Sequence, residues 1–349
     1  MRIVQFESKQ SGRRLGVVKG DVVCDITAKE PSLPRLYDAF SAAQEKNLRL
    51  TDFLAPLVDA SSTTLSYEML LASRSLDDGA VLRPPLDHED HHRVLVAGTG
   101  LTHLGGMKSR DQMHSDADAA EEDEASKSDS KKMFELGLKG GKPKPGVRGA
   151  APEWFFKGNG SVLRGHQDTL QIPPFALDGG EEPEIVGCYV IDTSGTPRRL
   201  GFALGNEWAD HATERINYLY LAPSKLRQCA VGPELITDEE FQHIELRCTV
   251  TRAGKLVYDS GPLLSGEEHM CHSLANCEDH HFKYPSHRVP GDVHLHFFGT
   301  SKLSHSERDW KFDDGDELRV EAAAFGGALG TRASGSPNGD PTPIRAELA

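Results

Sequence analysis

The sequence predicts a β-rich α+β protein, because segments with strand character outnumber segments with helical spacing. Turn residues separate many short apolar or alternating runs, most of them after residue 184. The 349 residues are enough for a large core and for two domains. We expect a small N-terminal α/β domain in residues 1–87, a larger β-rich domain in 88–330 and an exposed, Pro/Gly-rich tail in 331–349.

The N-terminal region predicts a hairpin followed by helices. Residues 14–18 and 22–26 are strand-like and flank the turn 19–21, typical of a β-hairpin. Helical spacing over residues 36–47 and start signals just before it predict a helix, and a second helix is expected near Leu70. Prolines 84 and 85 then mark a linker.

Residues 93–97 predict a buried strand that leads into a loop ending at His103. An insertion follows over 105–150, with helical potential in its second half. Long insertions in compact domains are usually lids or solvated loops. We expect lid function for about 105–114 and 131–146, whereas the acidic stretch 115–130 is at least as well explained as a solvated loop.

The larger domain is predicted to consist mainly of hairpins. Strand-like segments occur in pairs around turns or singly near the end of the domain, and two segments have helical spacing. The expected strands are 185–191, 199–204, 244–251, 255–258, 293–298 and 317–324, and the expected helices are 213–221 and 267–280.

Charge and cysteine usage exclude several classes of protein. The net charge of −14 argues against a general nucleic-acid surface, and six of those charges lie in residues 116–124. No apolar run is long enough to span a bilayer, and the start lacks the apolar core of a signal peptide. The six cysteines are dispersed without a CxxC pair, which is typical of reduced thiols and predicts a cytoplasmic protein.

The strongest chemical signal is a pair of alternating carboxylates, Glu182 and Glu184, at the start of a predicted strand. Side chains at i and i+2 of a strand share one face, so these groups repel unless a cation or a proton lies between them. Glu207 could supply a third oxygen to a hard divalent cation, and Lys225 follows eighteen residues later. From spacing alone, surface acids and a metal site both remain open.

Five motifs in a fixed order resemble those of the fumarylacetoacetate hydrolase superfamily. They are Glu182-x-Glu184, the segment Gly201–Glu207, Phe155-x-Lys157, Lys225, and Gly291-Asp292-Val293 with Gly299-Thr300. The resemblance covers about residues 93 to 326. It implies the mixed β-roll of that family and a homodimer.

The resemblance also implies roles for individual residues. Glu182, Glu184 and Glu207 would bind Mg²⁺ or Mn²⁺, with Asp210 as the alternative third ligand because most members have Asp where this chain has Glu207. Lys225 would be the base, its pKa lowered by burial beside the cation. The remaining assignments are Lys157, Gly299 and Thr300 as substrate contacts and His103 or His211 as the acid.

The predicted function is a hydro-lyase acting on a small 2-oxo sugar acid, with 2-keto-3-deoxypentonate giving 2-oxoglutarate semialdehyde. Proton removal from C3 would give an enolate that the metal stabilises, and a C4 hydroxyl would then leave as water. An acylpyruvate hydrolase, an oxaloacetate decarboxylase and a non-catalytic sugar-acid-binding regulator remain alternatives. The HExxH match at residues 88–92 precedes a strand rather than lying on a helix, which argues against a zinc protease.

Overall fold

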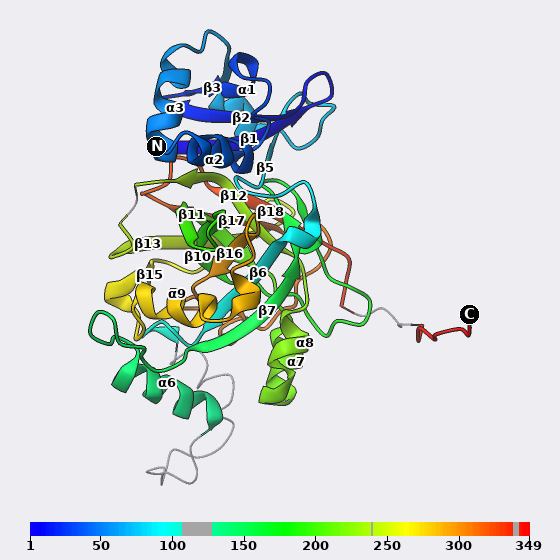
Figure 1. Ribbon diagram of the computed structural model, residues 1–349. Helices are drawn as coiled ribbons and strands as arrows, with labels where there is room; N and C mark the ends of the chain where they lie inside the picture. Colours follow the sequence, from blue (N-terminus) through cyan, green and yellow to red (C-terminus); the bar gives the residue numbers. More distant parts are fainter. Residues whose placement is uncertain (107–127, 239, 338–341) are drawn as a thin grey trace.

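The computed structural model describes residues 1–106, 128–238, 240–337 and 342–349 (Figure 1). Two β-sheets form the body, one of twelve strands and one of six, and short helices lie around them. This architecture confirms the predicted β-rich α+β class. Most of the expected acidic loop 115–130 and most of the expected lid segment 105–114 fall outside the described residues, and residues 128–130 belong to the start of a helix.

The N-terminal part forms one end of the large sheet and carries most of the early helices (Figure 1). The hairpin predicted around residues 19–21 is present, and β1 is the strand that continues into the body by pairing with β12. The elements are β1 (Arg2–Ser8), β2 (Gly12–Lys19), β3 (Val22–Asp25), α1 (Ile26–Lys29), α2 (Leu36–Glu45), α3 (Leu50–Asp59), β4 (Thr64–Ser66), α4 (Tyr67–Ala72) and β5 (Val81–Arg83).

The large sheet runs in the order β4-β3-β2-β1-β12-β11-β10-β16-β6-β7, with β5 beside β1 and β8 beside β12. Its middle strands are almost entirely buried, as expected of a sheet covered on both faces. The remaining strands are β6 (Val94–Gly100), β7 (Glu153–Asn159), β8 (Leu163–Arg164), β10 (Pro183–Ile191), β11 (Pro197–Glu207), β12 (Cys229–Ile236) and β16 (Val293–Phe297).

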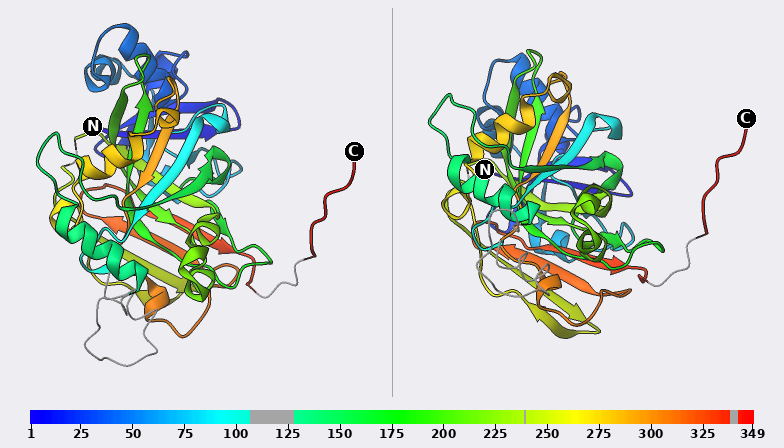
Figure 2. Two further views of the ribbon diagram at one scale, coloured as in Figure 1. Left: turned by 60° about the horizontal axis from the view of Figure 1, so that its bottom comes forward. Right: turned by 90° about the horizontal axis from the view of Figure 1, so that it is seen from below.

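The smaller sheet runs in the order β14-β13-β17-β18-β9, with β15 pairing β13. Figure 2 shows it as a second layer across the large sheet. A core of side chains from both sheets, including Phe202, Phe241 and Phe298, fills the space between them. Its strands are β9 (Thr169–Gln171), β13 (Ile244–Arg252), β14 (Lys255–Asp259), β15 (Leu263–Ser265), β17 (Glu317–Ala322) and β18 (Leu329–Ser334).

The later helices lie outside the sheets, and α9 (Leu274–Phe282) packs on a face of the large sheet, where His281 contacts His294 of β16 (Figure 1). Two expected helices are broken: 213–221 is α7, a 3₁₀ turn and α8, and 267–280 starts with a 3₁₀ turn before α9. The helices are α6 (Asp129–Gly140), α7 (His211–Ile216), α8 (Leu221–Lys225) and α9 (Leu274–Phe282), and the 3₁₀ turns are η1 (His91–Arg93), η2 (Gly160–Val162), η3 (Tyr218–Tyr220), η4 (Glu267–His269), η5 (Pro285–His287) and η6 (Ser304–Ser306).

The division into domains stays a prediction. The large sheet contains strands from both sides of the expected boundary near residue 87, because β1 pairs with β12. β18 extends to Ser334, so the first residues of the expected tail belong to a strand. Among the described residues, no helix is both long and apolar enough to cross a membrane.

Candidate metal and acid–base site

Three buried carboxylates meet at one end of the β10–β11 hairpin. Glu182, Glu184 and Glu207 each place a carboxylate oxygen within 4.8 Å of the other two. All three side chains are nearly inaccessible to solvent, although charged groups are rarely buried without partners. The cluster therefore needs neighbouring positive charge, a proton or a cation.

The register of the hairpin produces this cluster. Glu184 pairs with Gly205, and Pro183 pairs with Asn206. Continuing this register by one position places Glu182 opposite Glu207. The backbone N–H of Glu207 donates to the carbonyl of Glu182 at 2.9 Å. Alternation then directs the acids to one face of the hairpin.

Two lysines lie against the carboxylates. The Nζ of Lys225 forms ion pairs with Glu182 and, at 2.6 Å, with Glu207. The Nζ of Lys157 pairs with the other oxygen of Glu207 and donates to the carbonyls of Trp208 and Lys225. Lys157 therefore lies beneath Glu207 and fixes its carboxylate, rather than lining the cavity described below.

The pKa of Lys225 depends on the charge of its two carboxylate partners. Burial lowers it, but the charges of Glu182 and Glu207 outweigh burial and raise the pKa above that of an ordinary lysine. The predicted lowering assumes a bound cation and stays a prediction, whereas these two ion pairs decide the direction without one. Neutralising the carboxylates would leave burial as the main influence and reverse the shift.

The carboxylates also have unequal proton affinities. Burial, followed by the charges of Glu182 and Glu207, raises the pKa of Glu184 well above its ordinary value. Burial also opposes ionisation of Glu182, but the charge of Lys225 and the hydrogen bond with His211 outweigh it and lower that pKa. Burial, followed by the charge of Glu182, also raises the pKa of Glu207, so Glu184 and Glu207 are the acids that favour proton uptake when no cation is present.

The two candidate acid histidines lie on the same cavity but have different partners. His211 Nε2 is 2.9 Å from Glu182 Oε1, at the first turn of α7. His103 Nε2 is 2.9 Å from the hydroxyl of Ser265, and its Nδ1 is 3.0 Å from that of Thr102. Burial and the charge of His269 lower the pKa of His103 to about 3, so its imidazole is neutral near pH 7.

Gly299 and Thr300 close another side of the cavity. The Gly299 N–H donates to Glu184 Oε2 at 2.6 Å and so orients that carboxylate. Gly299 has φ of +90°, and a Cβ there would lie 2.5 Å from the hydroxyl of Thr102, so only glycine fits. The Thr300 hydroxyl donates to the carbonyl of Lys302.

Three residues on the cavity wall were missed by the sequence reasoning: Glu153, Glu214 and Lys302. Glu153 accepts a hydrogen bond from the Tyr218 hydroxyl at 2.8 Å. It shares one face of β7 with Lys157 at i+4, so strand alternation could have identified it. The other two come from irregular or short segments, for which no periodic signal exists.

Asp210, the alternative third ligand, has a different environment. Its carboxylate caps α7 through Thr213 and pairs with Arg227 at 3.2 Å. The structure brings Glu207, and not Asp210, beside the other two acids.

The acid cluster fits a hard divalent cation. Three carboxylate oxygens within 4.8 Å of one another match the oxygen donors that Mg²⁺ and Mn²⁺ accept. Burial makes the repulsion among these oxygens strong, and a cation would remove it. The cavity above them has a volume of about 50 Å³ and is open to solvent.

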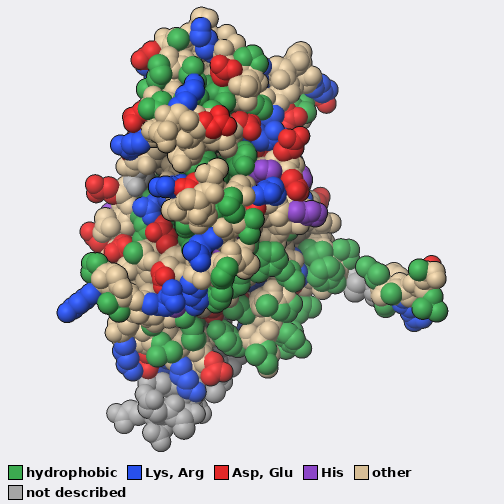
Figure 3. Space-filling model, in the orientation of Figure 1, with side chains coloured by type: hydrophobic (Ala, Val, Ile, Leu, Met, Phe, Trp, Pro, Cys, Tyr) green, Lys and Arg blue, Asp and Glu red, His purple; other side chains and the backbone are tan. Residues whose placement is uncertain are grey.

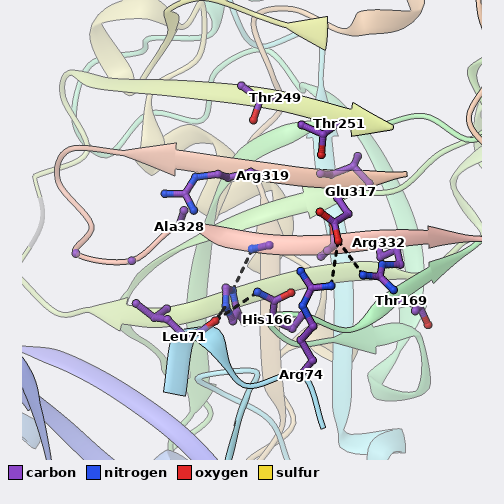
Figure 4. A pocket seen from close by; sticks show the side chains of 16 residues that line it. Leu71, Arg74, His166, Thr169, Thr249, Thr251, Glu317, Arg319, Ala328 and Arg332 are labelled. Atoms are coloured by element: carbon purple, nitrogen blue, oxygen red, sulfur yellow. Dashed lines mark hydrogen bonds and ion pairs between the residues drawn. The ribbon is translucent and has the colours of Figure 1, made fainter. Parts of the chain in front are cut away.

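A larger hollow of about 510 Å³ lies elsewhere and shares no lining residue with the acid cavity (Figure 4). Glu317 on its wall is held by both Arg74 and Arg332, as the dashed lines in Figure 4 show. The two guanidinium groups outweigh the one carboxylate, and among the described residues this wall holds no cluster of three metal-ligating side chains. The small cavity, rather than the large one, is therefore the candidate site.

The comparisons with known proteins give a distant sequence relative. No protein-family model matches the chain. A probable 2-keto-3-deoxyxylonate dehydratase of Haloferax volcanii is 25% identical over 180 residues, which is 50% of this chain and 58% of that relative. The match thus spans little more than half of the relative's length.

Solved structures share the whole fold at low identity. A 2-keto-3-deoxy-D-arabinonate dehydratase complexed with magnesium and 2,5-dioxopentanoate matches with a TM-score of 0.68 and 17% identity, over 97% of this chain and all of the other. A fumarylacetoacetate hydrolase of Exiguobacterium antarcticum matches with a TM-score of 0.59 and 16% identity, over 96% of this chain and all of the other. At this identity the likeness establishes the fold.

Proposed function

Because the chain has the fold of the fumarylacetoacetate hydrolase superfamily, we propose that it is a metal-dependent hydro-lyase acting on a 2-keto-3-deoxy sugar acid. The proposed reaction converts 2-keto-3-deoxypentonate into 2-oxoglutarate semialdehyde with loss of one water. The observation that carries the proposal is the contact of Lys225 Nζ with Glu182 and Glu207 beside Glu184, at one cavity. The named activities of the sequence relative and of the structural neighbour support it.

Glu182, Glu184 and Glu207 are the proposed ligands of Mg²⁺ or Mn²⁺. When bound, the cation would supply Lewis-acid stabilisation of the negative charge that develops on the 2-oxo acid. Lys157 holds Glu207 in place from below, and the Gly299 N–H does the same for Glu184. These contacts fix the ligand oxygens before binding, which reduces the cost of ordering them.

Lys225 is the proposed base at C3. Its ammonium loses the stabilisation by the carboxylates once their charge is neutralised, while burial still disfavours the charged form. Lys225 then takes the proton from C3, and the C4 hydroxyl leaves with a proton as water. The elimination gives an enone with its double bond between C3 and C4. Loss of a proton from C5 and return of a proton to C3 convert it into the C5 enol, which takes a proton at C4 as its hydroxyl loses one, so the net loss from substrate to semialdehyde is one water.

His211 and His103 are the proposed donors to the leaving hydroxyl. Both line the cavity, and His211 lies closer to the acids through its bond with Glu182. His103 is buried among hydroxyl partners, and its low pKa disfavours a charged imidazolium, whereas His211 contacts a carboxylate, so His211 is the proposed first choice.

We also propose that the chain forms a homodimer. Exposed apolar side chains gather over α7, α8 and the loop after β9, where Figure 3 shows a green surface. Contiguous apolar surface of this kind commonly marks a protein contact. The contributing residues are Phe175, Leu177, Ile216, Leu219, Tyr220 and Leu226.

Proton NMR of 2-keto-3-deoxy-L-arabinonate in deuterated buffer tests the activity, with magnesium present and then with chelator. Chelator-sensitive formation of the semialdehyde is the expected result. Exchange at C3 without loss of water would contradict the dehydratase and favour an acylpyruvate hydrolase or oxaloacetate decarboxylase, which the same spectra detect with those substrates. Folded, magnesium-loaded protein that causes no exchange would contradict enzymatic function and favour a sugar-acid-binding protein.

A further inference from the structure

A second group of metal-ligating side chains lies on the surface, apart from the acid cavity. His243, Glu268 and His269 each place one ligand atom within 4.8 Å of the other two. His243 Nδ1 is 2.7 Å from His269 Nε2, and it is 3.9 Å from Glu268 Oε2. None of the three lines the cavity of the acid cluster.

The backbone brings these residues together from two segments. His243 lies just before β13, and the other two belong to η4, just after β15, at the edge of the smaller sheet (Figure 1). The N–H groups of Glu267 and Glu268 donate to the carbonyls of Phe241 and Gln242 at 3.0 Å each. This pairing holds the η4 turn against the segment that carries His243.

Gly266 permits the close approach of the two segments. It has φ of +94°, and a Cβ on it would lie 2.5 Å from the carbonyl oxygen of Gln242. Only glycine adopts this conformation at this distance without strain. The backbone geometry thus fixes the positions from which the two histidine side chains extend.

The donor set has a definite chemical preference. Two imidazole nitrogens and one carboxylate oxygen are the ligands of many Zn²⁺ sites, in which water fills the fourth position. Each neutral imidazole can carry its hydrogen on the ring nitrogen that faces away, which leaves the two facing nitrogens free to bind. Mg²⁺ prefers oxygen donors, so two imidazole nitrogens and one carboxylate bind it less well than they bind Zn²⁺.

We propose that His243, Glu268 and His269 form a surface zinc site, separate from the magnesium or manganese site of the acid cluster. The side chains of His243 and Glu268 are 54% and 60% exposed, so an ion reaches them from solvent without any opening of the fold. Zinc there links η4 to the segment before β13.

The proposed site is connected to the candidate active site through the backbone. The His269 carbonyl accepts the N–H of Leu104 at 2.9 Å, and His103 forms a β-bridge with Met270. The N–H of Cys271 donates to the carbonyl of Thr102 at 2.7 Å. Zinc binding therefore stabilises the strand-like contact that holds the His103 segment in place.

Calorimetric titration with ZnCl₂ tests the site, in the full-length protein saturated with excess magnesium. We expect one zinc equivalent for the wild type. We expect its affinity to fall by at least about tenfold in His269→Ala and in His243→Ala, because removal of a ligand should cost no less than removal of a second-shell partner. His91→Ala, which removes an exposed histidine elsewhere, is the matched control and should bind as the wild type does.

Cobalt absorption and thermal melting provide independent readouts. Co²⁺ in place of zinc should give the strong visible bands of a low-coordinate site in the wild type and in His91→Ala. The two ligand variants should lose those bands while melting as the wild type does in chelator. Zinc should raise the melting temperature of the wild type and of His91→Ala, and should leave that of the two ligand variants unchanged.

The proposal fails if the magnesium-saturated wild type binds no zinc, or if both ligand variants keep the wild-type affinity and cobalt spectrum. Should the alanine variants unfold in chelator, Glu268→Gln tests the same site with an exposed side chain of equal size. Retention of wild-type zinc affinity in that folded variant would also overturn the assignment of Glu268. These outcomes do not depend on whether the acid cluster catalyses a dehydration.

Discussion

Glu184→Gln should stabilise the metal-free protein while removing most of its affinity for magnesium. The substitution keeps shape, and the glutamine carbonyl can still accept the Gly299 N–H. It removes the carboxylate that faces the charges of Glu182 and Glu207. Most substitutions at buried polar groups destabilise a protein, so the expected sign is unusual and informative.

The magnitude follows from the spacing of the oxygens. Two unit charges 4.8 Å apart repel by about 3.5 kcal/mol at an effective dielectric constant of ~20. Lys225 compensates part of this repulsion, and proton uptake by Glu184 limits the rest. We therefore expect the free energy of unfolding at pH 8 to rise by about 1–3 kcal/mol without metal, and magnesium affinity to fall by about 100-fold, or ~2.7 kcal/mol.

The pH dependence gives a second signature. Because the pKa of Glu184 is raised in the folded state, the folded protein binds more protons than the unfolded chain above the ordinary pKa of a carboxylic acid. Stability from this group is present at low pH and is lost as pH rises toward the folded pKa. Glu184→Gln should remove this loss.

Urea unfolding in chelator and in magnesium measures all three quantities. Glu181→Gln is the matched control, because Glu181 is a neighbouring buried acid that accepts two hydrogen bonds from Ser304 and lies outside the cluster. It should destabilise the protein and keep the stabilisation by magnesium. A Glu184→Gln protein that is less stable in chelator than the wild type, or that magnesium stabilises equally, would refute the reasoning.

Lys225→Met should lower turnover by at least about 1,000-fold with the fold retained, measured by product NMR, and near-wild-type turnover would exclude Lys225 as the base. Burial lowers the pKa of His296 to about 3, so the free energy of unfolding should decrease as the pH drops below 6.5, the ordinary pKa of histidine. The contribution of this group to the loss is about 2 kcal/mol at pH 5. His296→Phe should make the decrease of unfolding free energy with falling pH less steep, and an unchanged slope would contradict this. Leu219→Asp, at a side chain 83% exposed, should shift sedimentation toward monomer, whereas an unchanged dimer would place the interface elsewhere.

Local pattern was enough to predict much of the fold. The hairpins around residues 20, 195 and 253 were predicted because turn residues flank alternating or apolar runs. The strand β12 and helix α3 were missed: β12 carries Gly232 and Pro233, and α3 contains Pro56, and both residue types usually interrupt regular structure. The pairing of β1 with β12 could not be predicted, since sequence periodicity carries no information about distant partners.

The site was predictable where its residues share one strand or one motif. Glu182, Glu184 and Lys225 were identified from alternation and from the resemblance. The ion pairs that raise the pKa of Lys225 without a cation were not identified, because only the folded chain brings these charges together. The surface histidines His243 and His269 could not be predicted as neighbours, because no sequence motif links them. A hydrogen bond between two separate segments of the chain joins them.

The parallel pairing of β6 with β16 has a consequence for how the chain is made. Val94 pairs with Val293, so β6 leaves the ribosome long before its partner on that side exists. Until then an apolar strand edge is exposed to other nascent chains, a condition that favours aggregation. Synthesis at lower temperature or with chaperones should therefore raise the soluble yield of the protein.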